Sequence, residues 1–167
     1  MHRIYADNNA TTAVAPEVLE AMLPFLREQF HNPSSLYAAA GDVTRAIEHA
    51  RAAVAALVGA AMPGELTFTS GATEANTTAL RGAARARPTR RHIVTTAVEH
   101  PAVLEVGRDL EREGYDLTVL PVDREGRLDL RDLARALRPD TLLVSVMLAN
   151  NETGVIQPVA DRAAKAR

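Results

Sequence analysis

The sequence predicts an α/β domain with a mostly parallel sheet. From Leu66 onward, short β-prone runs alternate with helix-prone segments, the order that builds parallel sheets with right-handed crossovers. Residues 141–147 form a continuous apolar run, as in a strand that is buried on both faces of such a sheet. A length of 167 residues, 47% of them hydrophobic, is enough for one substantial core.

The first part of the chain predicts a short strand and two helices. Residues 4–12 suggest a strand that runs into a polar loop. A helix is expected from Pro16, and Pro24 should kink it or end it early. A second helix should begin at Gly41-Asp42 and end at Gly59. The apolar faces expected on these helices comprise Val18, Met22, Leu26 and Phe30 on the first, and Val43, Ile47, Ala50, Val54 and Leu57 on the second.

The later elements are predicted from changes of hydrophobic period. Strands are expected at 66–69, 92–96, 116–122 and 141–147, and helices at 74–86, at 102–113 and after Asp129. Pro101 suits a helix start, Gly114 suits a helix end, and residues 123–126 have the composition of a turn. The face of the helix after Asp129 should comprise Leu130, Leu133, Ala134 and Leu137.

Composition excludes several classes of function. A net charge of −2 argues against binding to nucleic acid or to a membrane surface, and no apolar run is long enough to span a bilayer. The N-terminal residues lack the apolar core of a secretion signal, so a cytoplasmic location is expected. The sequence has no cysteine, and its only lysine is Lys165, in an Ala-rich final segment expected to be helical. Chemistry that needs a reactive thiolate or a Schiff-base lysine therefore has almost no candidates here.

Polar clusters follow three of the predicted strands. They are Ser70 to Glu74, Glu99-His100-Pro101 and Asn150-Asn151-Glu152. Because the strands of a parallel sheet end at one edge, and ligands bind at that edge, these clusters predict a binding site.

The segment from Thr69 to Glu74 turns through Ser-Gly into a helix. Free N–H groups at the helix start, together with the hydroxyls of Ser70 and Thr73, could bind a phosphate. The alternative is an ordinary turn whose hydroxyls cap the helix. The sequence contains neither the dinucleotide-binding glycine pattern nor the P-loop pattern, which favours a phosphate monoester over a nucleotide.

His100 and the Asn150-Asn151 loop each have two interpretations. His100 could cap a helix at the surface, or it could stack on a ligand or act as an acid–base group. The Asn residues could be simple turn residues, or amide donors for a carboxylate or phenolate oxygen. No second histidine or carboxylate lies at a metal-ligand spacing from His100, so a metal site is not expected.

Five segments carry a family resemblance: Tyr5-x-Asp7-Asn-Asn-Ala-Thr-Thr12, Asn32-Pro-Ser-Ser35, Phe68-Thr-Ser-Gly-Ala-Thr-Glu74, Glu99-His-Pro-Ala-Val-Leu104 and Ala149-Asn-Asn-Glu-Thr-Gly154. In their order and spacing they resemble the cysteine desulfurases of the NifS/IscS type, fold-type I pyridoxal 5′-phosphate enzymes of the class V aminotransferase superfamily. The resemblance implies a three-layer α/β/α fold, here an incomplete large domain with a mostly parallel sheet. It also implies that residues 1–14 belong to a small domain and that residues 15–167 are a truncated cofactor-binding large domain.

The resemblance implies a role for each candidate site residue. Gly71, Ala72 and Thr73 would hold the cofactor phosphate, and His100 would stack on the pyridine ring and help to move protons. Asn151 would lie near the phenolic oxygen of the cofactor and the substrate carboxylate. The implied reaction removes sulfur from L-cysteine, giving alanine and an enzyme persulfide that is passed to an iron–sulfur scaffold protein. The implied assembly is a homodimer.

The sequence also departs from the family. The Schiff-base lysine, the aspartate that pairs with the pyridine nitrogen and the catalytic cysteine have no counterparts, and Lys165 does not match the lysine position. These 167 residues are therefore expected to be inactive alone; the alternative is a non-catalytic fragment that binds a phosphate or cofactor, or that dimerises. In the family's sheet order, residues 66–69 would lack their usual neighbours. The exposed apolar surface should favour instability or association.

Overall fold

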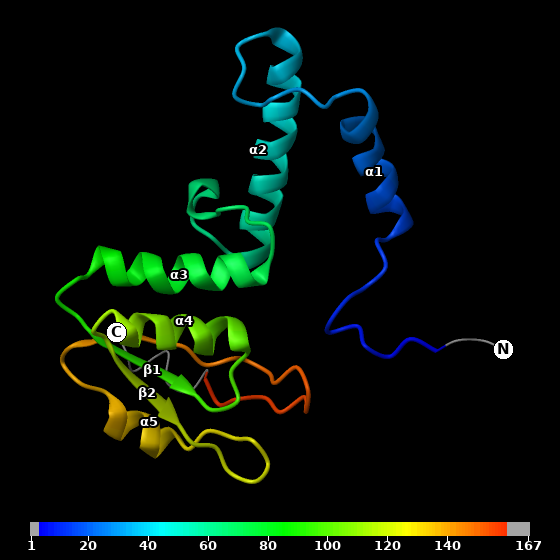
Figure 1. Cartoon of the computed structure of the whole chain (residues 1–167). Helices are drawn as coiled ribbons and strands as arrows, with labels where there is room; N and C mark the ends of the chain where they lie inside the picture. Colours follow the sequence, from blue (N-terminus) through cyan, green and yellow to red (C-terminus); the bar gives the residue numbers. More distant parts are fainter. Residues whose placement is uncertain (1–3, 160–167) are drawn as a thin grey trace. The chain divides into compact units, whose positions relative to one another are not determined.

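The computed structural model describes residues 4–159 and divides the chain into two compact units, Met1–Phe68 and Thr69–Arg167 (Figure 1). Lys165 and the rest of the expected final helix lie outside the described residues. The predicted domain boundary between residues 14 and 15 stays a prediction.

The first unit contains two α-helices, α1 (Pro16–Arg27) and α2 (Ala38–Val58), and a 3₁₀ turn, η1 (Pro63–Glu65). Pro16 occupies the first turn of α1 as predicted, and α1 continues through Pro24 for three further residues. It can do so because Pro24 clashes only with the preceding turn, near the end of a short helix. α2 begins three residues before the predicted Gly41, and Gly59 ends it with a φ of 71°, a conformation that favours glycine.

Two of the predicted strands are wrong. Residues 4–7 carry no strand, and residues 66–69 have no regular secondary structure and pair with no strand in the described part of the chain. A strand needs a neighbour for its N–H and C=O groups, which the local sequence cannot supply. The expectation that residues 66–69 lack sheet neighbours agrees with this finding. Arg51 partly replaces such neighbours, because it donates to the Leu66 carbonyl (2.7 Å) and lies over the Phe68 ring (4.8 Å).

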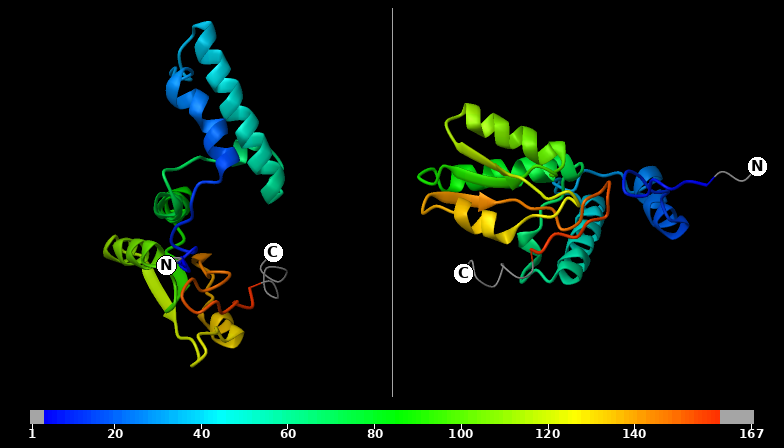
Figure 2. Two further views of the ribbon diagram at one scale, coloured as in Figure 1. Left: turned by 90° about the vertical axis from the view of Figure 1, so that its right-hand side faces the viewer. Right: turned by 90° about the horizontal axis from the view of Figure 1, so that it is seen from below.

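The second unit is a three-layer α/β/α structure, which confirms the predicted fold class. Its elements are α3 (Ala72–Ala86), β1 (His92–Thr96), α4 (Pro101–Arg112), β2 (Asp116–Leu120), α5 (Leu130–Ala136) and β3 (Thr141–Val144). All described strand pairings are parallel, in the order β2-β1-β3. Helices α3 and α4 cover one face of this sheet and α5 covers the other (Figures 1 and 2).

The alternation of side chains along β1 divides the core between the two faces. Ile93 packs with residues of α3 and α4, whereas Val94 packs with Leu133 of α5. β1 is buried throughout because it is the central strand. The prediction that 141–147 is a strand buried on both faces is wrong: β3 has only four residues, pairs with β1 alone among the described strands, and leaves Val144 exposed.

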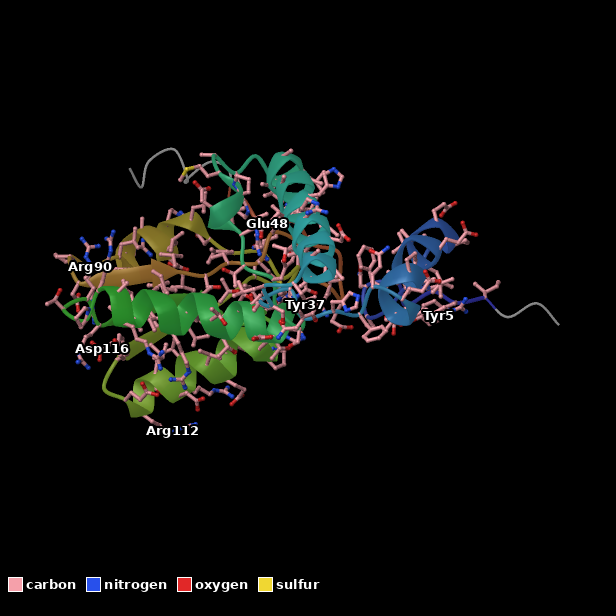
Figure 3. The ribbon with its side chains drawn as sticks, turned by 90° about the horizontal axis from the view of Figure 1, so that it is seen from above. Tyr5, Tyr37, Glu48, Arg90, Arg112 and Asp116 are labelled. Atoms are coloured by element: carbon pink, nitrogen blue, oxygen red, sulfur yellow. The ribbon has the colours of Figure 1, made fainter. Side chains whose placement is uncertain are left out.

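Ion pairs and a hydrogen bond stabilise the edge of the sheet where the strands begin. Arg138 pairs with Asp116 at 2.7 Å and with Asp140 at 3.0 Å, and Arg90 donates to the Thr141 carbonyl at 3.1 Å. Figure 3 labels Arg90 and Asp116 at this end of the unit. The polar clusters that the sequence predicts as a binding site lie at the opposite edge, where the strands end.

Candidate active site

The predicted site residues all lie in the second unit and all are exposed. Gly71, Ala72 and Thr73 form the start of α3, His100 precedes α4, and Asn151 lies in the loop after β3. In Figure 1 the N-termini of α3 and α4 lie at the same end of this unit as the carboxyl end of β1. The structure therefore places the first two polar clusters at one edge of the unit, and a hydrogen bond from Asn150 Nδ2 to the Val98 carbonyl (3.2 Å) brings the third cluster beside the second.

The first turn of α3 offers backbone donors, and we call the backbone of residues 71–74 the phosphate seat. The first amide with an intrahelical acceptor is that of Ala75, which donates to the Gly71 carbonyl at 3.0 Å. Among the described residues, the amides of Ala72, Thr73 and Glu74 have no protein acceptor. Three unpaired N–H groups at the positive end of a helix dipole are suited to an oxyanion.

Ser70 does not contribute its hydroxyl in the predicted way. Its amide and its hydroxyl both donate to Oε2 of Glu74, each at 2.7 Å. These two hydrogen bonds, the side-chain bond first, lower the pKa of Glu74 from its ordinary value. The Glu74 carboxylate therefore accepts from both Ser70 donors. The amides of Ala72, Thr73 and Glu74 remain available to another acceptor.

His100 is the N-cap of α4. Its Nδ1 accepts a hydrogen bond from the Ala102 amide at 3.1 Å, and Pro101 between them has no amide hydrogen to offer. With Nδ1 as the acceptor, the proton of the neutral ring is on Nε2. The capping and the ligand interpretations of His100 are therefore compatible, since capping uses Nδ1 and leaves Nε2–H and the ring faces exposed.

Residues 148–157, which we call the Asn loop, form a closed turn after β3. The Gln157 amide donates to the Leu148 carbonyl at 2.8 Å, and the Asn150 amide donates to the Val155 carbonyl at 2.9 Å. Gly154 has a φ of 74°, which allows the chain to reverse. Asn151 is exposed on this turn, and its side-chain Nδ2 donates to Glu152 Oε1 at 2.9 Å.

Two further residues of the predicted polar clusters, Glu99 and Asn150, also lie at this edge. Asn150 connects the Asn loop to the segment before His100, because its Nδ2 donates to the Val98 carbonyl at 3.2 Å. Glu99 is 8% exposed, and its Oε1 has no partner among the described residues. The sequence placed both residues in the polar clusters after the strands, but it predicted neither the burial of Glu99 nor the link from Asn150 to Val98.

Pyridoxal 5′-phosphate, the cofactor that the resemblance implies, fits this set of donors. Its phosphate would meet the unpaired amides of the phosphate seat and the Thr73 hydroxyl, and its ring would meet the exposed face of His100. The described residues contain no group of three or more histidine, cysteine or acidic side chains that could hold a metal ion. No helix in the described part of the chain is long and apolar enough to cross a membrane.

Comparison with solved structures supports the fold. A NifS-like protein matches with a TM-score of 0.93 and 42% identity, over 98% of this chain and 45% of its own. DndA from Streptomyces lividans matches with a TM-score of 0.81 and 44% identity, over 97% of this chain and 46% of its own.

Comparison with curated proteins gives the same result at the level of sequence. A cysteine desulfurase of Cereibacter sphaeroides is 55% identical over 95% of this chain, and cysteine desulfurase NifS of Azotobacter vinelandii is 49% identical over 98%. This chain spans 41% and 40% of their lengths, respectively. The predicted resemblance to cysteine desulfurases is thereby confirmed. A family model described as aminotransferase class-V matches residues 4–167. The chain belongs to the aminotransferase class-V family.

Proposed function

We propose that these residues form the part of a cysteine desulfurase that binds the phosphate and ring of pyridoxal 5′-phosphate. The observation that carries this proposal is the row of three unpaired amides at the start of α3, which lies at the same end of the second unit as the start of α4, where His100 is the N-cap. When bound, this cofactor supplies an electron sink for bond cleavage at the α-carbon of an amino acid.

Each site residue has a distinct task in this proposal. The phosphate seat binds the phosphate, which fixes one end of the cofactor. His100 packs its ring against the pyridine and holds a movable proton at Nε2, because the Ala102 amide occupies Nδ1. Asn151 donates to the phenolic oxygen of the cofactor or to the carboxylate of L-cysteine.

The wider role follows from the relatives and is proposed with it. The reaction would convert L-cysteine to alanine and deliver sulfur as a persulfide to an iron–sulfur scaffold protein, in the cytoplasm, with the protein acting as a homodimer. The 167 residues would bind the cofactor without turning over cysteine, because the sequence contains no cysteine and its only lysine is Lys165.

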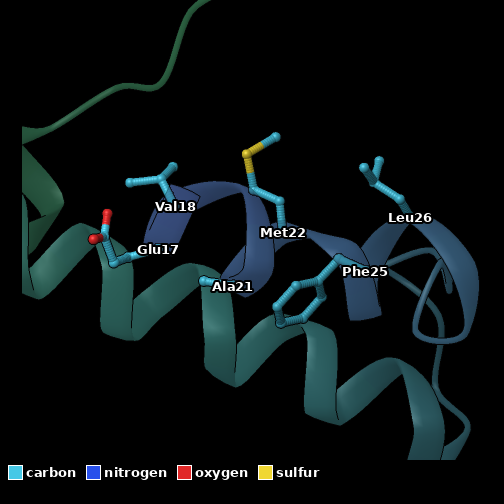
Figure 4. Close-up of a pocket in the computed structure, with 6 residues that line it drawn as sticks. All are labelled: Glu17, Val18, Ala21, Met22, Phe25 and Leu26. Carbon is cyan, nitrogen blue, oxygen red and sulfur yellow. The ribbon is translucent and has the colours of Figure 1, made fainter. Parts of the chain in front are cut away.

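A second candidate is a non-catalytic fragment that associates through an apolar surface. The first unit carries a shallow groove of about 430 Å³ along α1, lined by Glu17, Val18, Ala21, Met22, Phe25 and Leu26 (Figure 4). Five of these six side chains are apolar, and such a surface favours association.

A proline at residue 72 tests the proposal directly. Ala72 is the first residue of α3, where proline is tolerated, so Ala72→Pro removes one donor of the phosphate seat without breaking the helix. The matched control is Ala38→Pro, at the first residue of α2. We expect Ala72→Pro to weaken binding of pyridoxal 5′-phosphate, measured by titration calorimetry, and Ala38→Pro to leave it unchanged.

Two further ligands complete this experiment. Pyridoxal without its phosphate should bind weakly to both variants and to the parent chain, because the seat recognises the phosphate. Alanine release from cysteine should be absent for the 167 residues alone. Equal affinity of the parent chain and Ala72→Pro for pyridoxal 5′-phosphate, or no binding by the parent chain, would overturn the proposed function.

A further inference from the structure

Asn150 holds together the two segments that carry His100 and Asn151. Its side chain is half-buried and takes part in hydrogen bonds through both of its polar atoms. We infer that Asn150 is a positioning residue of the site: it sets the place of His100 relative to Asn151, although it touches neither reacting group. This inference rests on the proposed function, which gives those two residues their roles.

The oxygen of Asn150 orders the Asn loop. Oδ1 accepts from the Glu152 amide at 3.0 Å, from the Thr153 amide at 2.9 Å and from the Thr153 hydroxyl at 3.1 Å. These bonds fix the backbone on both sides of Asn151. A side chain that bonds to the backbone two and three residues ahead is a common way to stabilise a turn.

The nitrogen of Asn150 faces the other segment. Nδ2 donates to the Val98 carbonyl at 3.2 Å and lies 3.4 Å from the Met147 sulfur. Val98 lies two residues before His100, in the short connection between β1 and α4. Backbone bonds hold this connection at its ends, from the Ala97 amide to the Leu120 carbonyl (2.9 Å) and from the Val103 amide to the His100 carbonyl (2.9 Å). Asn150 adds a restraint in its middle.

Only an amide side chain of this length supplies both functions at once. An aspartate in place of Asn150 would keep an acceptor for the loop amides but would present a carboxylate, not a donor, to the Val98 carbonyl. Asn150→Asp therefore separates the two functions: the Asn loop stays capped and the link to Val98 is broken. Asn150→Ser, which is uncharged and can still accept from the loop amides, controls for the added charge.

The first readout needs no cofactor. In the full chain, amide hydrogen exchange by NMR should become faster at Glu99 and Ala102 in both variants, about three- to tenfold, the loss expected for one hydrogen bond. The ¹⁵N shifts of the His100 ring report whether Nδ1 still accepts from Ala102, and they should move toward those of a free imidazole. The matched control is Thr153→Val, which removes one bond to Oδ1 but leaves Nδ2 on Val98. It should leave both signals unchanged.

The second readout separates the ring from the phosphate. Asn150→Asp and Asn150→Ser should weaken binding of pyridoxal 5′-phosphate but leave the binding of inorganic phosphate to the seat on α3 unchanged. If the parent chain binds neither ligand, the proposed function fails, and the exchange rates still decide the role of Asn150. If both variants keep the parent His100 shifts, exchange rates and cofactor affinity, Asn150 is no positioning residue and the inference is overturned.

Discussion

His92 Nε2 and the Thr118 hydroxyl oxygen lie 2.9 Å apart, joining β1 to β2 on one face of the sheet. The other ring nitrogen, Nδ1, lies 2.8 Å from the Thr141 hydroxyl at the start of β3. A single imidazole, 1% exposed, thus connects all three strands at the edge opposite the proposed site.

The stability of the second unit should fall as the pH drops below about 6.5. Burial, and then the positive charge of Arg138, lower the pKa of His92 from its ordinary value of 6.5. The unfolded chain therefore takes up a proton near pH 6.5 while the folded chain does not. The stabilisation is fully present above that pH and decreases as the pH falls toward the folded pKa.

Urea unfolding between about pH 5 and pH 8 checks this prediction. The free energy of unfolding should decrease toward acid pH in the parent chain, and His92→Asn should be less stable at neutral pH but should lose that part of the slope. His49→Asn, at an exposed position of α2, is the control and should keep the parent slope. A parent slope retained by His92→Asn would contradict the assignment.

Gln157→Ala should destabilise the second unit by about 1–3 kcal/mol. The Gln157 side chain is 2% exposed, accepts from the Leu128 amide at 2.9 Å and donates to the Gly126 carbonyl at 2.7 Å. Its loss leaves backbone groups near the turn without partners. Urea unfolding measures the cost, and Gln29→Ala, at an exposed residue, should be close to neutral. Equal effects of the two substitutions would argue against the role of the buried amide.

Glu74→Gln should tighten binding of pyridoxal 5′-phosphate at low ionic strength. The Glu74 carboxylate lies on the first turn of the helix that would receive the phosphate, and two like charges there repel each other. The glutamine oxygen can still accept from Ser70, so the turn should be kept. Calorimetry at low and high salt checks this: the gain should shrink as salt screens the charge, and a gain independent of salt would show another cause.

The 167-residue chain should associate with itself through the exposed side of α1. Val18, Met22 and Leu26 are 52%, 45% and 65% exposed, and all three project from α1 in the close-up of Figure 4. Analytical ultracentrifugation should show an average molar mass that rises with protein concentration, and Met22→Glu should reduce this rise. The control is Ala52→Glu, at an exposed position of α2. Thr44 is not used for this purpose, because its hydroxyl donates to the Pro33 carbonyl. A monomer that melts cooperatively would contradict this prediction.

The features of the second unit that could be predicted are those that local sequence preferences determine. The run 92–96 is β1 as predicted, and Pro101 and Gly114 delimit α4 closely, because proline and glycine have strong local preferences. Asp129 caps α5 as expected, with its carboxylate accepting from the Arg131 amide at 2.7 Å. These features depend on residues close in sequence.

The remaining features depend on partners far along the chain. Residues 66–69 have a β-prone composition but no neighbouring strand in the described structure, so composition alone gave a wrong strand. At the site, the position of His100 was predictable, whereas the capture of Ser70 by Glu74 was not. The link from Asn150 to Val98 spans 52 residues, and no local pattern could reveal it.

The helix cap at His100 has a consequence for how this histidine responds to its surroundings. Where a carboxylate orients a histidine, the orientation depends on the charge of that carboxylate, which salt screens and acid neutralises. The orientation of His100 comes from the Ala102 peptide group, which is uncharged and does not titrate near neutrality. The backbone of α4 therefore fixes which nitrogen carries the proton, and this choice should persist through changes in ionic strength.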